Sequence, residues 1–577
     1  MHFFERVVDG RTYRYAAQSV WNPRKKQPVS RQALLGPADP APTVDLSKTR
    51  RVGTRRLGDV GALAWVAEQL DLVRLIDTAC AESGTGSGPS VGEWALAVAV
   101  QRSCEPGAKS ALADFLGSSV ARISCLPAAS FTGQGFHRAA TQVTDAQLEQ
   151  AQVAIARAAV ERFGLAADVL AFDSTNFDTH IATTTPGELA RRGHAKSKRA
   201  DLRVVGLGVM VSETGHVPLF HRTYPGNSSD QAVLASCLKG LAQLHDELDA
   251  AAGGRRRAGR TLVRDGGFWS EQLELDLDGA RYRSLISLPL SHAAAEQALV
   301  AAAQRGAMKH LKGNLSHVRA ARIDAAPVGE LKRTLVVVES EELLRGQKRG
   351  IAVALRKASV ELRKLERRVV AGRKITKGAL QAKTKKLLGR EHLSSFVTTE
   401  IGGTDEAPTF AWRVDPARRR ELEQTRLGRR VLCTDCGLWS TERIVSAFRS
   451  QWNVEELFRR SKKGGLVPWG PSHQWADSSL RFHTFSTVLG LTLVALANLA
   501  LGAKKSARVV MQELSGIEAT LVRTSTGKKG RRPLVMLAPE LSPLQARAAD
   551  LFELARWMPT IATAMPAARS SRAGAVQ

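Results

Sequence analysis

The sequence is short of cysteine. Six cysteines are scattered over 577 residues, a number and spacing that exclude the dense disulfide framework of a small secreted domain. The N-terminal stretch "MHFFERVVDG" carries no recognisable secretory signal. We therefore expect a reducing cytoplasm of the bacterial type.

Acidic residues are also scarce relative to basic ones. Aspartate and glutamate number 55 against 83 lysines and arginines, which leaves a formal net charge of +28. An excess of this size makes a polyanion the first partner to expect. Hydrophobic residues make up 44% of the chain, enough for globular packing throughout, and the length predicts two to four structural units.

Long hydrophobic runs are nearly absent. One uncharged run, "FSTVLGLTLVALANLALGA" from Phe485 to Ala503, is just long enough to cross a bilayer. Its Ser, Thr, Asn and Gly content and its solitary occurrence favour a helix buried on all sides in a large core. We therefore expect no membrane association.

Changes in composition and hydrophobic periodicity along the chain predict six regions. A turn at Asp9 and Gly10 indicates a small basic β unit, which is followed by a region of helical periodicity. Two segments of mixed α/β texture come next, separated by a basic interruption with charged helices, and a tail region ends the chain. In that order, the predicted boundaries are 1–50, 51–165, 166–290, 291–428 (the interruption), 429–505 and 506–577.

Two aspartates stand at the ends of predicted strands. "DVLAFDSTNF" reads as a short apolar strand that delivers Asp173 at its end, and "GRTLVRDGGFW" as another with Asp265 at its carboxyl end. Between them, "RVVGLGVMVSETGHVPLFHRTY" predicts a hairpin that turns at 213–216, and a helix is expected from about Asp230 to Ala251. Strand ends in a mixed sheet are where ligand groups converge.

A glutamate occupies an unexpected position in the helix predicted for "AFRSQWNVEELFRRSKKGG", residues 447–465. At about 100° per residue from Ile444, Glu455 falls on the same line as Phe448 and Phe458, whereas Glu456 points to the polar side. A carboxylate on an apolar stripe must be paired, protonated or bound to a metal, because an isolated buried charge is too costly. The alternative is a rim position with the Glu455 stem on the core and its head in water.

Three carboxylates thus stand out as one candidate set: Asp173, Asp265 and Glu455. Hard divalent cations prefer carboxylate oxygens. Two such ions about 3.5–4 Å apart can activate a water or hydroxyl and stabilise the leaving oxygen of a phosphodiester. We therefore expect Mg²⁺ as the cofactor, with Mn²⁺ able to replace it.

At these residues the sequence resembles the DDE transposases of bacterial insertion sequences, in the insertion-sequence-4 superfamily and most like its 1634 group. That family's third-carboxylate motif is Tyr, two residues, Arg, three residues, Glu, six residues, Lys. The spacing is met here by Phe448, Gln451, Glu455 and Lys462, with Phe for Tyr and Gln for Arg. "DSTNF", "VRDGGF", "GHAKSKRADLRVVGLGV" and "YPGNSSD" are similar to the other blocks of the family.

The resemblance implies an α/β fold, with a ribonuclease H-like mixed-sheet catalytic core, an inserted domain at 291–428 and a mostly helical N-terminal region that binds DNA. It implies metal-dependent strand cleavage at the ends of an insertion sequence and strand transfer into target DNA. Asp173, Asp265 and Glu455 would be the catalytic metal ligands. The DNA-binding residues that we expect are Lys462, Gln451, Lys196, Lys198 and Arg199.

The implied partner is double-stranded DNA, both the terminal inverted repeats and the target. A dimer or larger assembly is expected on DNA, because two ends must be brought together, and the bound protein would be associated with the nucleoid. Two other functions stay open. One is a non-catalytic DNA-binding protein descended from a transposase, and the other is a ribonuclease H-like nuclease that cuts without joining.

Several residues also have competing interpretations. Asp435, after the strand "RRVLCT", is a rival metal ligand by position. Asp230 is more simply a helix N-cap. Cys433 and Cys436 form a lone CxxC, which we interpret as reduced core thiols and not as a zinc site. Trp269 is expected in the core, with base stacking as the alternative.

Overall fold

The computed structural model divides the chain into two compact units. The first contains Met1–Arg260 and Ser450–Gln577, and the second contains Thr261–Arg449. The boundary therefore falls inside the region predicted to span 166–290. The structure describes all residues except 23–26, 39–48, 81–87, 252–258, 305, 373–374, 503, 525–533, 538–539 and 559–577.

The first unit begins with a three-stranded antiparallel sheet. Its strands are β1 (His2–Val8), β2 (Arg11–Asn22) and β3 (Gln27–Pro37), in that order. The turn from β1 to β2 lies at Asp9 and Gly10, whose φ angles are 50° and 72°. Asp-Gly tolerates positive φ at both turn positions, so the predicted N-terminal hairpin is confirmed.

Six α-helices follow the sheet, as the helical periodicity predicted. The capping boxes Ser90/Glu93 and Thr144/Gln147 start the two longest of them, α3 and α6. The predicted break at "ESGTGSGPS" falls largely on 81–87, outside the described residues. The helices are α1 (Gly58–Gln69), α2 (Leu72–Ala79), α3 (Val91–Cys104), α4 (Leu112–Gly117), α5 (Gly133–Thr141) and α6 (Asp145–Phe163), with short 3-10 turns η3 (Lys109–Ala111) and η4 (Ala128–Ser130).

A long apolar helix, α16 (Asp477–Leu501), forms the centre of this unit. It packs against α1, α3, α5, α6, α17 and strand β7, and 83% of its most apolar window is buried. The helix is long and apolar enough to span a membrane by length and composition alone. Its burial among these elements confirms the interpretation as a core helix.

The C-terminal region folds back onto the N-terminal part of the unit. Strand β16 (Glu518–Thr524) pairs with both β4 (Thr49–Arg56) and β17 (Leu534–Leu537) in a three-stranded antiparallel sheet. The tail is therefore an integral part of the first unit. Its helices are α17 (Ala507–Ser515), α18 (Pro543–Leu551) and the 3-10 turn η7 (Leu554–Trp557).

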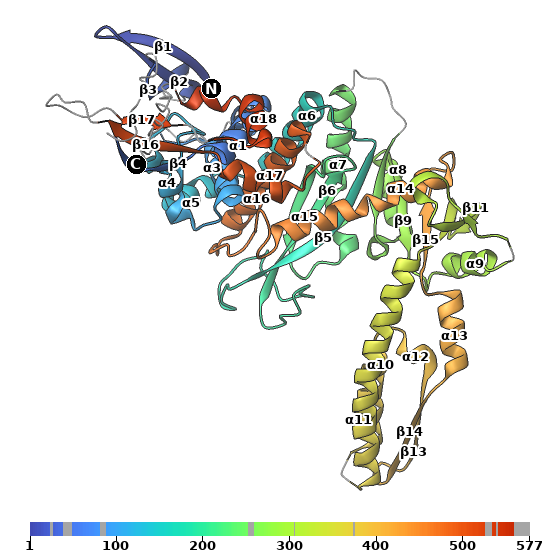
Figure 1. Cartoon of the computed structure of the whole chain (residues 1–577). Helices are drawn as coiled ribbons and strands as arrows, with labels where there is room; N and C mark the ends of the chain where they lie inside the picture. Colours follow the sequence, from blue (N-terminus) through green and yellow to red (C-terminus); the bar gives the residue numbers. More distant parts are fainter. Residues whose placement is uncertain are drawn as a thin grey trace, which may run out of the picture. The chain divides into compact units, whose positions relative to one another are not determined.

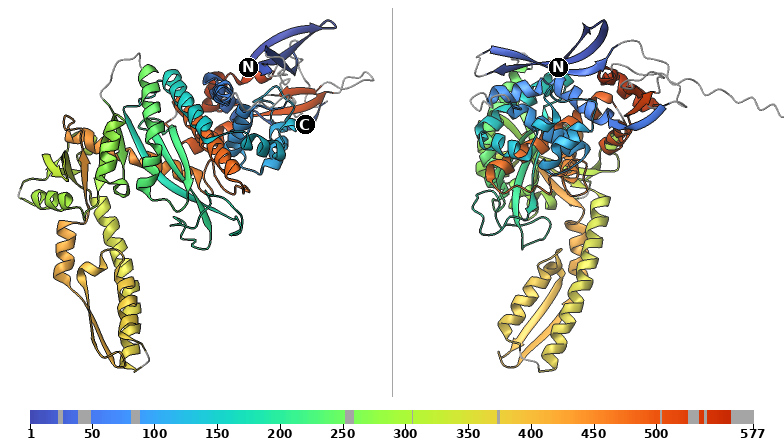
Figure 2. Two further views of the ribbon diagram at one scale, coloured as in Figure 1. Left: turned by 180° about the vertical axis from the view of Figure 1, so that it is seen from behind. Right: turned by 90° about the vertical axis from the view of Figure 1, so that its left-hand side faces the viewer.

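Three antiparallel strands and one helix build the α/β part of the first unit. Strand β5 (Val169–Thr179) pairs with β6 (Arg203–Ser212), which forms the predicted hairpin with β7 (Pro218–Pro225). Helix α7 occupies Asp230–Ala251, as predicted, and packs beside α6 (Figures 1 and 2). One expectation is wrong: β5 does not end at Asp173. It continues for six residues, "STNFDT", which keep pairing with β6.

The second unit has a sheet core with strand order β10-β11-β12-β15-β9-β8. Asp265 directly follows β8, as predicted. The elements are β8 (Arg260–Arg264), η5 (Gly266–Phe268), α8 (Glu271–Gly279), β9 (Tyr282–Leu288), α9 (Ala293–Ala302), β10 (Lys309–His310), η6 (Gly313–Leu315), β11 (Arg319–Val328), β12 (Leu331–Glu339), β15 (Arg429–Thr434) and α14 (Thr441–Arg449).

A helical arm, residues 341–427, is inserted between β12 and β15. It has a hydrophobic cluster of its own, to which Leu362, Phe396 and Phe410 belong. Figures 1 and 2 show its long helix α10 running beside the β13–β14 hairpin. The elements are α10 (Glu341–Val370), α11 (Lys377–Leu388), α12 (Leu393–Phe396), β13 (Val397–Gly403), β14 (Pro408–Val414) and α13 (Pro416–Thr425).

The fold-class prediction is confirmed: the protein is mixed α/β. Along the chain, the order is a strand bearing Asp173, an antiparallel hairpin, helix α7, a strand ending at Asp265 and, after the insertion, a helix bearing Glu455. This is the order of elements expected for a ribonuclease H-like core.

The close packing between β6 and β7 yields a first test. A Cβ on Gly206 would run into the ring of Tyr224, which is buried and donates from its hydroxyl to the Thr175 carbonyl at 3.2 Å. We expect Gly206→Ala to lower the free energy of unfolding by about 1–3 kcal/mol, measured by urea denaturation. Gly53→Ala, where a Cβ meets no atom within 4 Å, is the control, and equal stabilities of the two variants would contradict the packing.

Candidate active site

Asp173 lies within β5, opposite Val209 of β6, and is half-buried. Its Oδ1 accepts a hydrogen bond from the Ser174 backbone N–H at 2.7 Å. The Ser174 hydroxyl in turn donates to Asp230 Oδ1 at 2.6 Å. Asp230 is the first residue of α7. Its hydrogen bond with Ser174 therefore links that helix to β5 next to Asp173, which is a structural role.

Helix α15 (Gln451–Ser461) packs across β5 and β6 within the first unit. The Gln451 side-chain amide donates to the Phe172 carbonyl at 3.3 Å, one residue before Asp173. Two residues further along the helix, Asn453 Nδ2 donates to the Glu213 carbonyl at 2.8 Å. The first amide fixes the start of the helix against the strand that carries Asp173, and the second fixes it against the turn after β6.

The expectation that Glu455 lies on the apolar stripe is wrong. The predicted helix is interrupted at Ser450, so α14 ends at Arg449 and α15 begins at Gln451. The directions counted from Ile444 therefore do not continue into α15. Its core side is formed by Gln451, Asn453, Val454, Leu457, Phe458 and Ser461.

Glu455 is exposed, and no hydrogen bond or ion pair of its side chain occurs among the described residues. Its neighbour Glu456 is the enclosed one, with a side chain only 11% exposed and ion pairs to Arg459 and Arg460. The two adjacent glutamates thus exchange the environments that the sequence predicted. An exposed carboxylate with no cationic partner is accessible to a cation or a substrate.

Gln451, predicted to contact DNA, is buried, with 8% of its surface exposed. Its amide nitrogen is used on the Phe172 carbonyl. Its Oε1 is buried and has no hydrogen-bond partner within the described part of the chain. Gln451 therefore positions α15, and its oxygen is an orphaned acceptor close to the backbone that leads into Asp173.

Two lysines contribute positive charge to the surroundings of Asp173. Partial burial and the proximity of Lys196 lower the pKa of Lys462 below its usual value, against the attraction of Asp173 and Asp178. The Lys196 ammonium donates to the Ser174 carbonyl. These two lysines and two aspartates form one charged group, here called the lysine–aspartate cluster: Lys196, Lys462, Asp173 and Asp178.

The loop that carries Lys196 is held against β5 by side chains of that strand. Asn176 donates to the His194 carbonyl at 2.8 Å and accepts from the Lys196 backbone N–H at 3.0 Å. Asp178 accepts from the Ser197 hydroxyl at 2.7 Å. The loop of Lys196 is therefore fixed to β5 near Asp173, and its role in binding DNA stays a prediction.

The other two basic residues of the loop differ in pairing. Arg199 binds Asp201 with two contacts, 2.8 Å from Nε and 2.6 Å from a terminal nitrogen, and this pairing lowers the pKa of Asp201 to about 2. Lys198 is exposed, with a φ of 65°. The charge of Arg199 is therefore already compensated, whereas Lys198 points to solvent.

The segment after α15 is also folded back onto β5. The Trp469 backbone N–H donates to the Ser461 carbonyl at 2.7 Å, and its ring stacks on Phe177 with centroids 4.9 Å apart. The first and last residues of the segment 461–469 are thus hydrogen-bonded to each other, and this bond fixes the position of Lys462. Sequence reasoning missed this role of Trp469.

Asp265, the remaining predicted ligand, belongs to the second unit and is exposed. Among the described residues, no group of three His, Cys, Asp or Glu side chains is arranged to hold a metal ion. The first unit offers Asp173 and Glu455. The complete set of three stays a prediction from the sequence.

The rival residues of the second unit have structural roles. Asp435 accepts from the Ser284 backbone N–H at 3.0 Å, and burial raises the pKa of its carboxyl. Cys433 and Cys436 are buried free thiols, and burial raises the pKa of Cys433 to about 12, which confirms the interpretation as core thiols. Trp269 is only half-buried and packs edge-on to His292.

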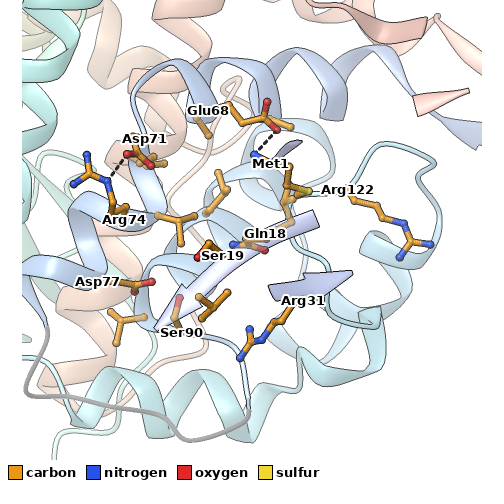
Figure 3. A pocket seen from close by; sticks show the side chains of 18 of the residues that line it. Met1, Gln18, Ser19, Arg31, Glu68, Asp71, Arg74, Asp77, Ser90 and Arg122 are labelled. Carbon is orange, nitrogen blue, oxygen red and sulfur yellow. Dashed lines mark hydrogen bonds and ion pairs between the residues drawn. The ribbon is translucent and has the colours of Figure 1, made fainter. Parts of the chain in front are cut away.

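A cavity of about 770 Å³ in the first unit contains none of the predicted site residues. It lies between the N-terminal sheet and helices α1–α3, and Figure 3 shows arginine and carboxylate side chains together on its walls. Arg74 pairs with Asp71, and the N-terminal ammonium lies 3.7 Å from Glu68. In each of these two pairs, a cation of the lining is offset by a carboxylate.

A second, smaller depression is basic. Arg191, Arg192 and Arg203 line a space of about 400 Å³ together with Thr183. Arg203 is fixed by donating to the carbonyls of Thr183 and Thr185. These arginines precede and follow the loop of Lys196 along the chain, and sequence reasoning did not single them out.

Comparisons with known proteins give little guidance. No protein-family model and no curated protein matches the chain. Among solved structures, the chain is similar to the piggyBac transposase in its cryo-EM synaptic complex with hairpin DNA. The TM-score is 0.37 and the identity 11%, over 81% of this chain and 82% of that one. That protein is a transposase, but this similarity does not assign the present chain to the insertion-sequence-4 superfamily.

The anchoring of α15 can be tested through stability. We expect Gln451→Ala and Asn453→Ala each to lower the free energy of unfolding by about 0.5–1.5 kcal/mol, the usual net contribution of one hydrogen bond. Arg459→Ala, at a side chain 76% exposed, should change it by less than about 0.5 kcal/mol. Urea denaturation followed by circular dichroism provides the measurement, and a larger loss at Arg459 would contradict the anchoring.

Proposed function

We propose that the protein is a metal-dependent DNA transposase that cleaves DNA at the ends of an insertion sequence and joins the freed 3′ end to target DNA. The observation that carries the proposal is the placement of α15 on β5. It brings the helix of Glu455 against the strand of Asp173. Lys196 and Lys462 of the lysine–aspartate cluster place two ammonium groups beside Asp173, where a phosphate would be bound.

The proposed metal ligands are Asp173 and Glu455 of the first unit, with Asp265 added from the sequence motif. The donor chemistry fits a hard cation, since carboxylate oxygens are its preferred ligands. The orphaned Gln451 Oε1 and the uncompensated Glu455 carboxylate support the fit, because both lack a donor among the described residues. Bound Mg²⁺ or Mn²⁺ would supply water activation and stabilisation of the leaving oxygen.

The chain's own residues have separate tasks in this proposal. Lys196 and Lys462 hold phosphate oxygens and offset the negative charge that develops during phosphoryl transfer. Gln451 holds the Glu455 helix on β5, and Asn453 holds it on the turn after β6. Asn176 and Asp178 fix the loop that presents Lys196. Joining two DNA ends would require at least two copies of the chain.

The decisive substitution is Glu455→Gln, which keeps the size and removes the charge. We expect cleavage of a labelled duplex from the ends of the element to fall by about 100- to 1,000-fold or more, while DNA binding and stability change little. The wild-type reaction should require Mg²⁺ or Mn²⁺ and stop in excess chelator. The measurement is a gel assay for cleaved and joined products.

Glu456→Gln is the neighbouring control. Because Glu456 is enclosed by two arginines, this variant should lose some stability but retain cleavage at a temperature where it is folded. Equal loss of cleavage at both positions would remove Glu455 from the ligand set. Cleaved products without joined products would identify a nuclease, and binding without cleavage in any metal would identify a non-catalytic DNA-binding protein.

The place of Lys462 beside Lys196 and Asp173 predicts a phosphate contact. Lys462→Ala should reduce the slope of log affinity against log salt by about 1 on duplex DNA from the ends of the element. Lys463→Ala removes the same charge from an adjacent exposed position and should leave the slope nearly unchanged. Fluorescence anisotropy at several salt concentrations measures both, and identical slopes for the two variants would rule out a specific contact at Lys462.

A further inference from the structure

Helix α10 of the helical arm packs one side onto the arm's hydrophobic cluster. Beneath it lie strand β14 and helices α11 and α12. At about 100° per residue, its core-facing positions spread over about 100° of the helix circumference, centred near Ile351. Those positions are Leu344, Ile351, Ala354, Leu355, Ala358, Leu362, Leu365 and Val369.

The opposite side of α10 bears a line of arginines, here called the arginine row. Their spacing is four, seven, seven and four residues, which keeps their directions within about 40° of one another and about 140° from Ile351. All five are exposed. The row consists of Arg345, Arg349, Arg356, Arg363 and Arg367.

The arginine row is not compensated by carboxylates. Within the described residues, no ion pair ends on any of its five members. Two cations of α10 that lie off the row do have acidic partners: Lys348 pairs with Glu423 at 2.9 Å, and Lys364 with Glu361 at 2.7 Å. The row is therefore a surface of net positive charge on a rigid, well-packed helix.

The dimensions of the row suit a DNA duplex. The 22 residue-to-residue steps from Arg345 to Arg367 span about 33 Å at 1.5 Å per step, close to one helical turn of duplex DNA at about 34–36 Å. Arginine is well suited to phosphate oxygens, because its planar guanidinium donates two hydrogen bonds in parallel. A self-complementary contact between two copies would instead place the two rows of like charge together.

We infer that the arginine row of α10 binds the phosphate backbone of double-stranded DNA without reading its sequence. The inference rests on the proposed function in that DNA is its substrate, but it assigns a binding surface outside the lysine–aspartate cluster. Contacts to phosphates position DNA and carry no sequence information. The row therefore supplies affinity for any duplex, target DNA included.

The test is a triple variant of the full-length protein, Arg349→Ala, Arg356→Ala and Arg363→Ala, on a duplex of random sequence. Loss of three phosphate contacts should lower the slope of log affinity against log salt by about 2.7. The matched control, Lys348→Ala, Lys364→Ala and Arg419→Ala, removes three arm cations that pair with carboxylates. It should change the slope by less than about 1.

Helix content and the melting temperature verify folding, and alanine at these solvent-facing positions favours the helix. An unchanged slope in the folded row variant would overturn the inference, as would equal slope changes in the row variant and the control. Loss of binding to vesicles of anionic lipid with unchanged DNA binding would also overturn it.

Failure of the transposase proposal is separately visible. In one outcome, Glu455→Gln cleaves normally and the row variant shows the lower slope of log affinity against log salt. The arginine row is then a DNA-binding surface, and the catalytic assignment of Glu455 is wrong. In the other outcome, the row variant binds a random duplex normally and Glu455→Gln abolishes cleavage. The catalytic assignment of Glu455 is then supported, and the arginine row is not a DNA-binding surface.

Discussion

The packing of α15 on β5 and β6 is the constraint on which the candidate site depends. Neither Asp173 nor Glu455 has a fixed relation to the other unless the helix is held against the strand. Two side-chain amides hold it, through backbone carbonyls at Phe172 and Glu213. The Phe172 carbonyl belongs to the paired strand β5, and the Glu213 carbonyl belongs to the turn that directly follows β6. Both anchor a helix that must present a carboxylate with a defined position.

Much of this architecture could be predicted from the sequence, because its signals are local. The Asp9-Gly10 turn, the β6–β7 hairpin and α7 follow from turn chemistry and periodicity. The interruption at Ser450 could not be predicted in this way, since neither glycine nor proline marks it. As a result, directions counted from Ile444 placed Glu455 on the core side, and the structure gives the enclosed position to Glu456.

Spacing predicted the candidate site residues, but it did not predict their neighbours. Asn176, Asp178 and Ser174 lie within the segment that was interpreted as one motif, yet what they bind is distant along the chain. Gln451 illustrates the same limit. Its position in the motif predicted a DNA contact, while its burial and its bond to Phe172 depend on tertiary packing that no local pattern encodes.

The distribution of compensated and uncompensated charge separates two tasks within the chain. Near Asp173, the cations face carboxylates: Lys196 and Lys462 lie close to Asp173, and Arg199 pairs with Asp201. Such cations gain less from a phosphate, because they exchange one anion for another. On duplex DNA, the arginines of α10 would exchange only water and mobile counterions, whose release favours binding at low salt. In the proposed function, affinity for duplex DNA would therefore come mainly from the arm, and phosphoryl-transfer chemistry from the residues around β5.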